Sequence, residues 1–187
     1  MDLDAEEYLV KQAQKDPGAF GKLYDHYYPK IFGYVLRRTA SLEIAQDITS
    51  ETFFEALRKL WQFHWRSISF SSWLYRIATN EINQYFRKAE RRKSFSLEEL
   101  QEQGFEPVSP QDPVSELLEG QEELRQHQEF LQIQEKIVQL PAKYQAVITL
   151  RFFEQKQIKE IAEILGKKEG TIKSLLHRAV EKLREPC

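Results

Sequence analysis

The stretch "IKEIAEILGKKEGTIKSLLHRAVEKL", residues 158–183, decides the expected fold of the second half of the chain. Apolar side chains recur at helical spacing from Ile158 to Leu165, and the next residue, Gly166, suits the left-handed end of a helix. A second helix is expected to begin at residues 169–170. Two short helices joined by a tight turn form a helix-turn-helix, an arrangement whose second helix enters the major groove of DNA.

The second of these helices has two distinct faces. At about 100 degrees per residue, its apolar residues stack on one side and its polar residues on the other. The apolar side holds Ile172, Leu176, Ala179 and Leu183. The polar side holds Ser174, His177, Arg178 and Glu181. A helical hairpin with a merely solvated outer face has the same pattern, so spacing alone leaves DNA contact and simple solvation both open.

The rest of the chain also has helical periodicity, and no alternating strand pattern competes with it. Apolar residues recur at helical spacing within 20–31, 44–57, 73–82 and 133–153. Residues 94–121 have three prolines, two glycines and no sustained helical stripe, which is typical of a flexible linker. We therefore expect an all-α protein of two small helical domains, residues 1–93 and 122–187, joined by this linker, with the second domain ending in the helix-turn-helix.

Charge is segregated along the chain, although the formal net charge is only -2. Residues 1–93 have 15 Lys and Arg against 12 Asp and Glu, residues 94–135 have 1 against 11, and residues 136–187 have 11 against 6. Two basic units on either side of an acidic tether suggest that both ends bind a polyanion. A solvated linker between two ordinary domains is the alternative reading of the same charges.

The overall composition excludes several classes of protein. With 41% hydrophobic and 30% charged residues and no long apolar run, the chain is not expected to insert into a membrane. Its amino terminus is acidic where a signal peptide would be basic, and a single cysteine, Cys187, excludes an internal disulfide. These features favour the reducing cytoplasm.

Residues 61–92 combine the three side-chain types that bind single-stranded nucleic acid, namely aromatic rings, amides and cations. The rings are Trp61, Trp65, Phe70, Trp73 and Tyr75, the amides are Asn80, Asn83 and Gln84, and the cations are Arg76, Arg87, Lys88, Arg91 and Arg92. Rings at helical spacing with aliphatic neighbours usually belong to a core, and we expect this of Phe70 and Trp73.

Three stretches resemble one family, the extracytoplasmic-function sigma factors of RNA polymerase. Residues 140–185, "LPAKYQAVITLRFFEQKQIKEIAEILGKKEGTIKSLLHRAVEKLRE", resemble their promoter-binding carboxy-terminal domain. Residues 45–61, "AQDITSETFFEALRKLW", resemble their polymerase-clamp helix, and residues 70–92, "FSSWLYRIATNEINQYFRKAERR", resemble their promoter-melting helix. The resemblance implies an alternative sigma factor that binds core RNA polymerase, directs it to promoters and helps to open the DNA.

The resemblance also implies roles for individual residues. The implied polymerase-binding strip is Asp47, Ser50, Glu51 and Phe54. The implied contacts with the downstream promoter element and the melted strand are Trp73, Arg76, Asn80, Asn83, Gln84 and Arg87, with a loop of about residues 62–69 that holds a flipped base. The implied contacts with the upstream element are Thr171, Lys173, Ser174, His177 and Arg178.

Four positions depart from the family pattern. Ser50 stands where glutamine is usual, Gln84 where relatives often have an acidic residue, and Leu175 and Val180 where they often have arginine. The last two flank the apolar stripe and are expected to widen the core contact. The implied partners are core RNA polymerase, promoter DNA in double- and single-stranded form, and an anti-sigma protein, which nothing in the sequence identifies.

No catalytic, metal or cofactor motif appears in the sequence. The four histidines fall in unrelated segments, no zinc-type spacing exists, and the glycines form no phosphate loop. We expect no enzymatic activity, no metal and no cofactor. The remaining alternatives are a free-standing helix-turn-helix regulator, which the tail alone would support, and a nuclease, which would require a carboxylate cluster that the sequence does not provide.

Overall fold

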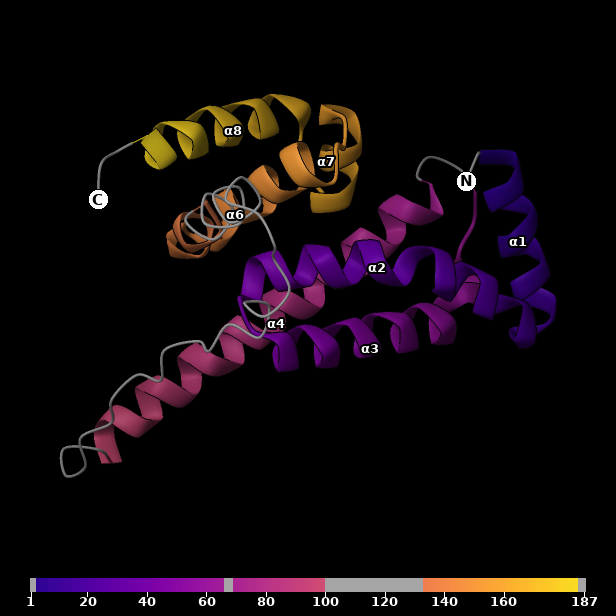
Figure 1. The fold of residues 1–187 in the computed structure, drawn as a ribbon, viewed down its shortest axis with the longest axis horizontal. Helices are drawn as coiled ribbons and strands as arrows, with labels where there is room; N and C mark the ends of the chain where they lie inside the picture. The colour runs from indigo at the N-terminus through magenta and orange to yellow at the C-terminus, as the bar shows by residue number, and fades with distance from the viewer. Residues whose placement is uncertain (1–2, 66–68, 100–132, 185–187) are drawn as a thin grey trace, which may run out of the picture.

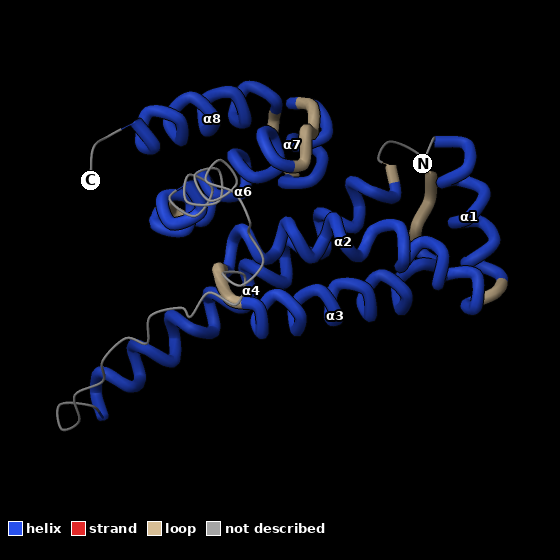
Figure 2. Tube along the Cα trace, in the orientation of Figure 1, coloured by secondary structure: helices blue, strands red, loops and turns tan. Residues whose placement is uncertain are grey.

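The computed structural model describes residues 3–65, 69–99 and 133–184, and it contains helices but no strand within these ranges (Figure 2). The N-terminal domain, by which we mean residues 3–99, contains four α-helices: α1 (Leu3–Lys15), α2 (Phe20–Thr39), α3 (Leu42–Lys59) and α4 (Phe70–Glu99). Single 3₁₀ turns, η1 (Pro17–Ala19) and η2 (Leu60–Gln62), follow α1 and α3.

The C-terminal domain, residues 133–184, is smaller. Residues 133–139 are helical, and they are followed by α6 (Ala142–Ile148), the π-helical turn η3 (Thr149–Phe153), α7 (Ile158–Leu165) and α8 (Glu169–Arg184). Figure 1 shows these helices gathered on one side of α2, while the last turns of α4 project beyond the rest of the molecule. The expected all-α architecture is confirmed.

The core of the N-terminal domain lies between α2, α3 and α4, which pack on one another. Side chains at helical spacing on α2, including Leu23 and Ile31, are fully buried, as are Leu74 and Ile82 on α4. Phe70 is also fully buried, as expected, and its ring lies 5.7 Å from the ring of Phe63. The apolar stripes read from the sequence therefore form a single core.

Helix α1 fixes the beginning of α4. The buried carboxylate of Glu6 accepts a hydrogen bond from the hydroxyl of Tyr27 and another, of 3.0 Å, from the backbone N–H of Ser71. The N–H groups in the first turn of a helix have no partner within the helix, and a carboxylate there also interacts favourably with the helix dipole. Ser69 adds a second cap, because its Oγ accepts from the N–H of Ser72 at 3.1 Å.

The helix-turn-helix forms as its sequence predicts. Gly166 ends α7 in the left-handed region with φ 61°, where glycine avoids the strain that a side chain would bring. A capping box between Gln157 and Glu160 begins α7. Leu175 and Val180 are half-buried and pack against the core, so the expected widening of the core contact is confirmed.

One sequence expectation about element boundaries is corrected and another is refined. Residues 94–99, which we expected to begin the linker, continue α4, because the run "SFSLEE" contains neither glycine nor proline to end the helix. The helical periodicity expected over residues 133–153 is divided between elements, since Pro141 separates residues 133–139 from α6. The remainder of the expected linker, residues 100–121, lies outside the described residues.

None of the helices in the described part of the chain has the length and apolar character needed to cross a membrane.

Candidate functional site

The predicted polymerase-binding strip lies along the exposed face of α3. Asp47, Ser50, Glu51 and Phe54 are all exposed, and 60% of Phe54 is accessible to solvent. Two carboxylates, a hydroxyl and an aromatic ring therefore lie along one side of the helix, available to a partner. A phenylalanine left this exposed on a surface helix is typical of an anchor in a protein interface.

The apolar part of this strip is longer than the sequence pattern indicated. Leu57 is 41% exposed and Trp61, on η2, is 71% exposed, and both follow Phe54 at helical spacing. Trp61 had been grouped with the rings for single-stranded DNA on composition alone. Its place after Phe54 and Leu57 at helical spacing puts it in the same exposed apolar row.

The acidic part of the strip also extends onto α4. Burial raises the pKa of Glu81, and the nearby carboxylates of Glu51 and Glu55 raise it further. Glu55 itself is held by Arg58 and Lys59, whose hydrogen bonds lower its pKa to about 2. Three carboxylates therefore converge between α3 and α4, and only Glu51 belonged to the predicted set.

The predicted reading face of α4 has an exposed half and a covered half. Asn80, Gln84 and Arg87 are exposed, while Asn83 is half-buried with its carbonyl accepting from Arg87 at 3.3 Å. Trp73 is half-buried at the other end of the face and packs on Phe63, with ring centroids 5.1 Å apart. Arg76 contacts the C-terminal domain.

Two of the five rings in residues 61–92 are buried, which confirms the expectation for Phe70 and corrects the grouping of Tyr75 with the rings for single-stranded DNA. Phe70 is fully buried in the core, and 2% of Tyr75 is exposed. A ring inside the core cannot stack on a base, so composition overestimated the number of stacking platforms. Trp65, by contrast, is half-buried next to a cleft.

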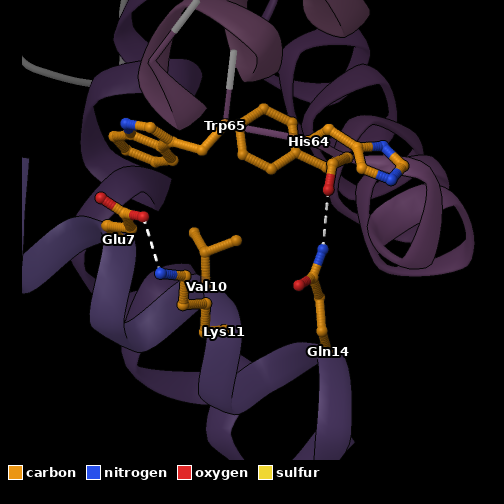
Figure 3. A pocket seen from close by; sticks show the side chains of 7 residues that line it. Glu7, Val10, Lys11, Gln14, His64 and Trp65 are labelled. Carbon is orange, nitrogen blue, oxygen red and sulfur yellow. Dashed lines mark hydrogen bonds and ion pairs between the residues drawn. The ribbon is translucent and has the colours of Figure 1, made fainter.

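This cleft, of about 260 Å³, lies between α1 and the loop that precedes α4 (Figure 3). Val10, Phe63 and Trp65 supply apolar lining, and an ion pair of 2.8 Å between Glu7 and Lys11 borders it. The lining is completed by His64 and Gln14. The amide of Gln14 fixes the loop by donating to the carbonyl oxygens of residues 60 and 63 at 3.0 and 2.8 Å. Of the predicted base-binding loop, residues 66–68 lie outside the described part.

The predicted DNA-reading face of α8 is fully exposed. The five side chains named from the sequence lie on the outer surface of the helix: Thr171, Lys173, Ser174, His177 and Arg178. His177 lies 3.5 Å from Glu181, and Ser174 donates to the carbonyl of Gly170 at 3.0 Å. Among the described residues, no side chain of another helix covers this face.

A buried polar contact joins the two domains. The carboxylate of Glu154, at the end of η3, accepts from Arg37 of α2 at 3.0 Å and from the hydroxyl of Tyr75 of α4. Next to it, Lys156 donates to Ser71 at 2.9 Å and lies over the Tyr75 ring at 5.2 Å from its centre. These residues are 79 to 117 positions apart in the sequence, so no local pattern indicated the contact.

Arg76 is held in the same interface. Its guanidinium donates to the backbone carbonyl of Glu163 on α7, and beside it lies a cleft of about 440 Å³. Lys159, Lys167 and Lys168 also line this cleft. A residue expected to read DNA thus contacts the protein itself in this arrangement of the domains.

Among the described residues, no three His, Cys, Asp or Glu side chains are grouped so that they could hold a metal ion.

Comparison with known families matches both domains. Residues 23–92 match the family described as sigma-70 region 2, and residues 130–183 match the family described as sigma-70, region 4. The two matches cover α3, α4 as far as residue 92, and the helix-turn-helix.

Individual proteins are similar over nearly the whole chain. The ECF RNA polymerase sigma factor SigW of Bacillus subtilis is 34% identical over 185 residues, which cover 94% of this chain and 93% of SigW. The ECF RNA polymerase sigma factor BldN of Streptomyces coelicolor is 34% identical over 176 residues, covering 94% of this chain but 63% of BldN.

A solved structure has the same fold. The sigma factor RpoE from Bartonella quintana, crystallised with the anti-sigma factor NepR, superposes with a TM-score of 0.63 at 21% identity. The match covers 88% of this chain and 94% of that one.

Proposed function

The chain belongs to the extracytoplasmic-function group of sigma-70 factors, the subunits that direct RNA polymerase to promoters, and from this premise we propose which of its surfaces performs each step. Sigma factors are initiation factors and not enzymes. The match of residues 23–92 to a sigma-70 region removes the reading of the chain as a free-standing helix-turn-helix regulator, since that reading rested on the tail alone.

Core RNA polymerase binds the α3 surface, which we define as Asp47, Ser50, Glu51, Phe54, Leu57 and Trp61. The observation that supports this most directly is the exposed apolar row on a helix whose opposite face is fully used in the core. An acidic strip with aromatic anchors complements a basic helical partner. The charges steer the encounter, and the rings supply most of the affinity once the partner covers them.

The downstream promoter element binds the exposed part of α4. Asn80, Gln84 and Arg87 offer amide and guanidinium groups to base edges and phosphates. The cleft beside Trp65 and His64 has room for one unstacked base, with an apolar wall for its ring and polar groups at its rim. Arg76 joins this surface when the C-terminal domain has moved away, and the half-buried Trp73 lies at its other end.

The upstream promoter element binds the exposed face of α8. Arg178 can make a bidentate pair with a guanine edge, His177 can contact a base or the backbone, and Lys173 and Thr171 can hold phosphates. All four side chains are exposed along this one helix.

We also propose that an anti-sigma protein binds this chain and that the chain acts in the cytoplasm. RpoE, whose fold this chain shares, was crystallised with an anti-sigma factor. We place the activity in the cytoplasm, where RNA polymerase and the chromosome meet.

Run-off transcription with core polymerase tests the proposal most directly. Transcription from a cognate promoter should depend on this chain, and the double variant Glu51→Lys, Phe54→Ala should lose core binding and transcription together. The matched control is Glu135→Lys, Ile133→Ala, which reverses one exposed carboxylate and removes one exposed apolar side chain in the other domain. Equal loss in both double variants, or full core binding by the first, would contradict the assignment of the α3 surface.

A further inference from the structure

The contact between the domains resembles an anion-binding site in which the Glu154 carboxylate is the bound anion. One oxygen of the Glu154 carboxylate lies 3.0 Å from Nη1 of Arg37, and the other accepts from the hydroxyl of Tyr75. The Glu154 side chain is 8% exposed. An arginine and a hydroxyl that converge on two oxygens of one anion form a geometry that suits a phosphate equally well.

Contacts within the N-terminal domain hold Tyr75 in place, whereas the Arg37 guanidinium also lies over the Phe153 ring of the C-terminal domain, 5.0 Å from its centre. The Tyr75 ring packs edge-on against Tyr34 at 5.2 Å, and the Tyr34 hydroxyl is hydrogen-bonded to Thr79 at 2.8 Å. Arg37 lies along α2 over Gly33, where an added Cβ would come within 2.9 Å of Nη1. Because Gly33 has no side chain, the Arg37 guanidinium has room to lie there. The N-terminal domain therefore fixes the Tyr75 donor before an occupant arrives and leaves room beside it for the Arg37 guanidinium.

Two further arginines of the covered surface donate to neutral oxygens. Arg38 is fully buried, and among the described residues it donates to two neutral oxygens, the Tyr34 hydroxyl at 3.1 Å and the carbonyl of Ala142 at 3.4 Å. Arg76 likewise donates to a backbone carbonyl. In the described residues, the Nε atoms of Arg37, Arg38 and Arg76 have no hydrogen-bond partner. A buried cation without an anion is unfavourable, so this surface retains unused capacity for negative charge.

A backbone phosphate can take the place of the Glu154 carboxylate between Arg37 and Tyr75. Burial raises the pKa of this carboxyl group, although Tyr75, Arg37 and Lys156 act in the opposite direction. The ionised carboxylate is thus less favourable here than in water. A backbone phosphate keeps its negative charge at any physiological pH and offers two free oxygens to the same donors.

We propose that Arg37 and Tyr75 form a binding site for a backbone phosphate of the promoter strand, and that Glu154 fills this site while the two domains are closed on each other. DNA and the C-terminal domain then compete for one position on the N-terminal domain. The site adjoins Arg76, so the same movement that empties it also frees a reading residue of α4. This inference rests on the proposed function, since it assumes that the strand lies along α4.

The test uses the full chain and a fluorescently labelled single-stranded DNA oligonucleotide of mixed sequence, because phosphate contacts do not depend on sequence. Glu154→Ala should raise the affinity for this DNA about tenfold, the scale of one charge-assisted hydrogen bond. Glu135→Ala removes the same charge from an exposed position of the same domain and should have little effect. The oligonucleotide should also lengthen the distance between fluorophores placed on the two domains.

Second variants show where the phosphate binds. Adding Arg37→Ala or Tyr75→Phe to Glu154→Ala should abolish the gain, and the arginine change should lower the salt dependence by about one phosphate contact. Tyr75→Phe keeps the ring in the core, and thermal melting verifies that each variant is folded. A gain that survives both second changes would overturn the inference.

Two further outcomes would also overturn it. Glu154→Ala could separate the domains without strengthening DNA binding, or it could strengthen binding to polyglutamate and not to DNA, in which case the site serves an acidic protein. The proposed function is judged separately, by whether Arg87→Ala lowers promoter-specific transcription. A loss there together with no DNA gain in Glu154→Ala would reject the phosphate site alone.

Discussion

Helices α4 and α8 are both proposed to read DNA, yet they present their polar faces in opposite ways. The outer face of α8 is open along its length, with Lys173, His177 and Arg178 exposed. The polar face of α4 is exposed at Asn80 and beyond, whereas Arg76 is bound to the carbonyl of Glu163 in the other domain. One helix is ready for its ligand, and the other is partly covered by the protein itself.

The difference follows from how each helix is packed. Helix α8 uses a single apolar face against α6 and α7, which leaves the rest of its surface free. Helix α4 contacts α2 and α3 on one side and α7 on another. A helix with neighbours on several sides is held firmly in place, but part of its surface can bind a ligand only after one of those neighbours has moved. The following predictions test this contrast, beginning with the largest expected effect.

Removing the Phe70 ring should unfold the scaffold on which α4 depends. Phe70→Ala is expected to lower the free energy of unfolding of the N-terminal domain by about 3–5 kcal/mol, because a fully buried ring leaves a cavity. Urea denaturation followed by circular dichroism measures this loss. Phe54→Ala, which removes a ring that is 60% exposed, should change stability by about 0.5 kcal/mol or less. Similar losses in the two variants would mean that the α4 scaffold does not depend on this core.

Removing Arg178 should affect promoter choice through α8 alone. Arg178→Ala is expected to lower promoter discrimination by about 1–3 kcal/mol, as for the loss of one base contact, and to leave core affinity unchanged. Promoter-specific transcription measures the discrimination between promoters, and a separate binding assay measures the affinity for core polymerase. Lys182→Ala changes another exposed cation, in the last turn of the same helix, and is the matched control. A parallel fall in core affinity would show that α8 is not a separate reading surface.

Acidification should favour the closed arrangement that covers α4. Because burial raises the pKa of Glu154 above its ordinary value of 4.5, the closed state binds this proton more tightly than the open state. The stabilisation of the closed state by this proton is therefore largest below pH 4.5, and it disappears as the pH rises through the raised pKa of Glu154.

Energy transfer between fluorophores on the two domains, recorded from neutral pH downwards, measures this closure. Glu154→Gln should remove the pH dependence, since an amide does not titrate. Persistence of the same profile in that variant would assign the effect to another group.

Gly33→Ala should have the smallest effect and should act only on the covered helix. The new methyl group would displace the Arg37 guanidinium, which lies 2.9 Å from the Cβ position, and would loosen its hold on Glu154. Gly21→Ala is a matched control on the same helix, because its Cβ would meet no atom within 4 Å. Both changes should favour the helix by roughly 0.5–1 kcal/mol, and only the first should lower closure in the energy-transfer measurement. Equal closure in the two variants would remove Gly33 from the description of the site.

The sequence by itself determined the features that depend on near neighbours. Helical periodicity predicted the buried stripe of α8 and the exposed positions of His177 and Arg178, and Gly166 marked the turn before it, because residues three or four apart share a face whatever the rest of the chain does. The exposed strip on α3 followed from the same rule. Composition was less reliable: it counted Tyr75 as an available ring, whereas the helical spacing of Phe70 correctly predicted that this ring belongs to the core.

Only the tertiary structure decided the features that join distant segments. The cleft beside Trp65 combines α1 with a loop some 50 residues later, and Glu154 meets Tyr75 across 79 positions and Arg37 across 117. No periodicity relates such residues, because their meeting depends on how two separately packed domains lie against each other. The sequence therefore determined which helix faces are polar, and the packing of the two domains decided which of those faces is open.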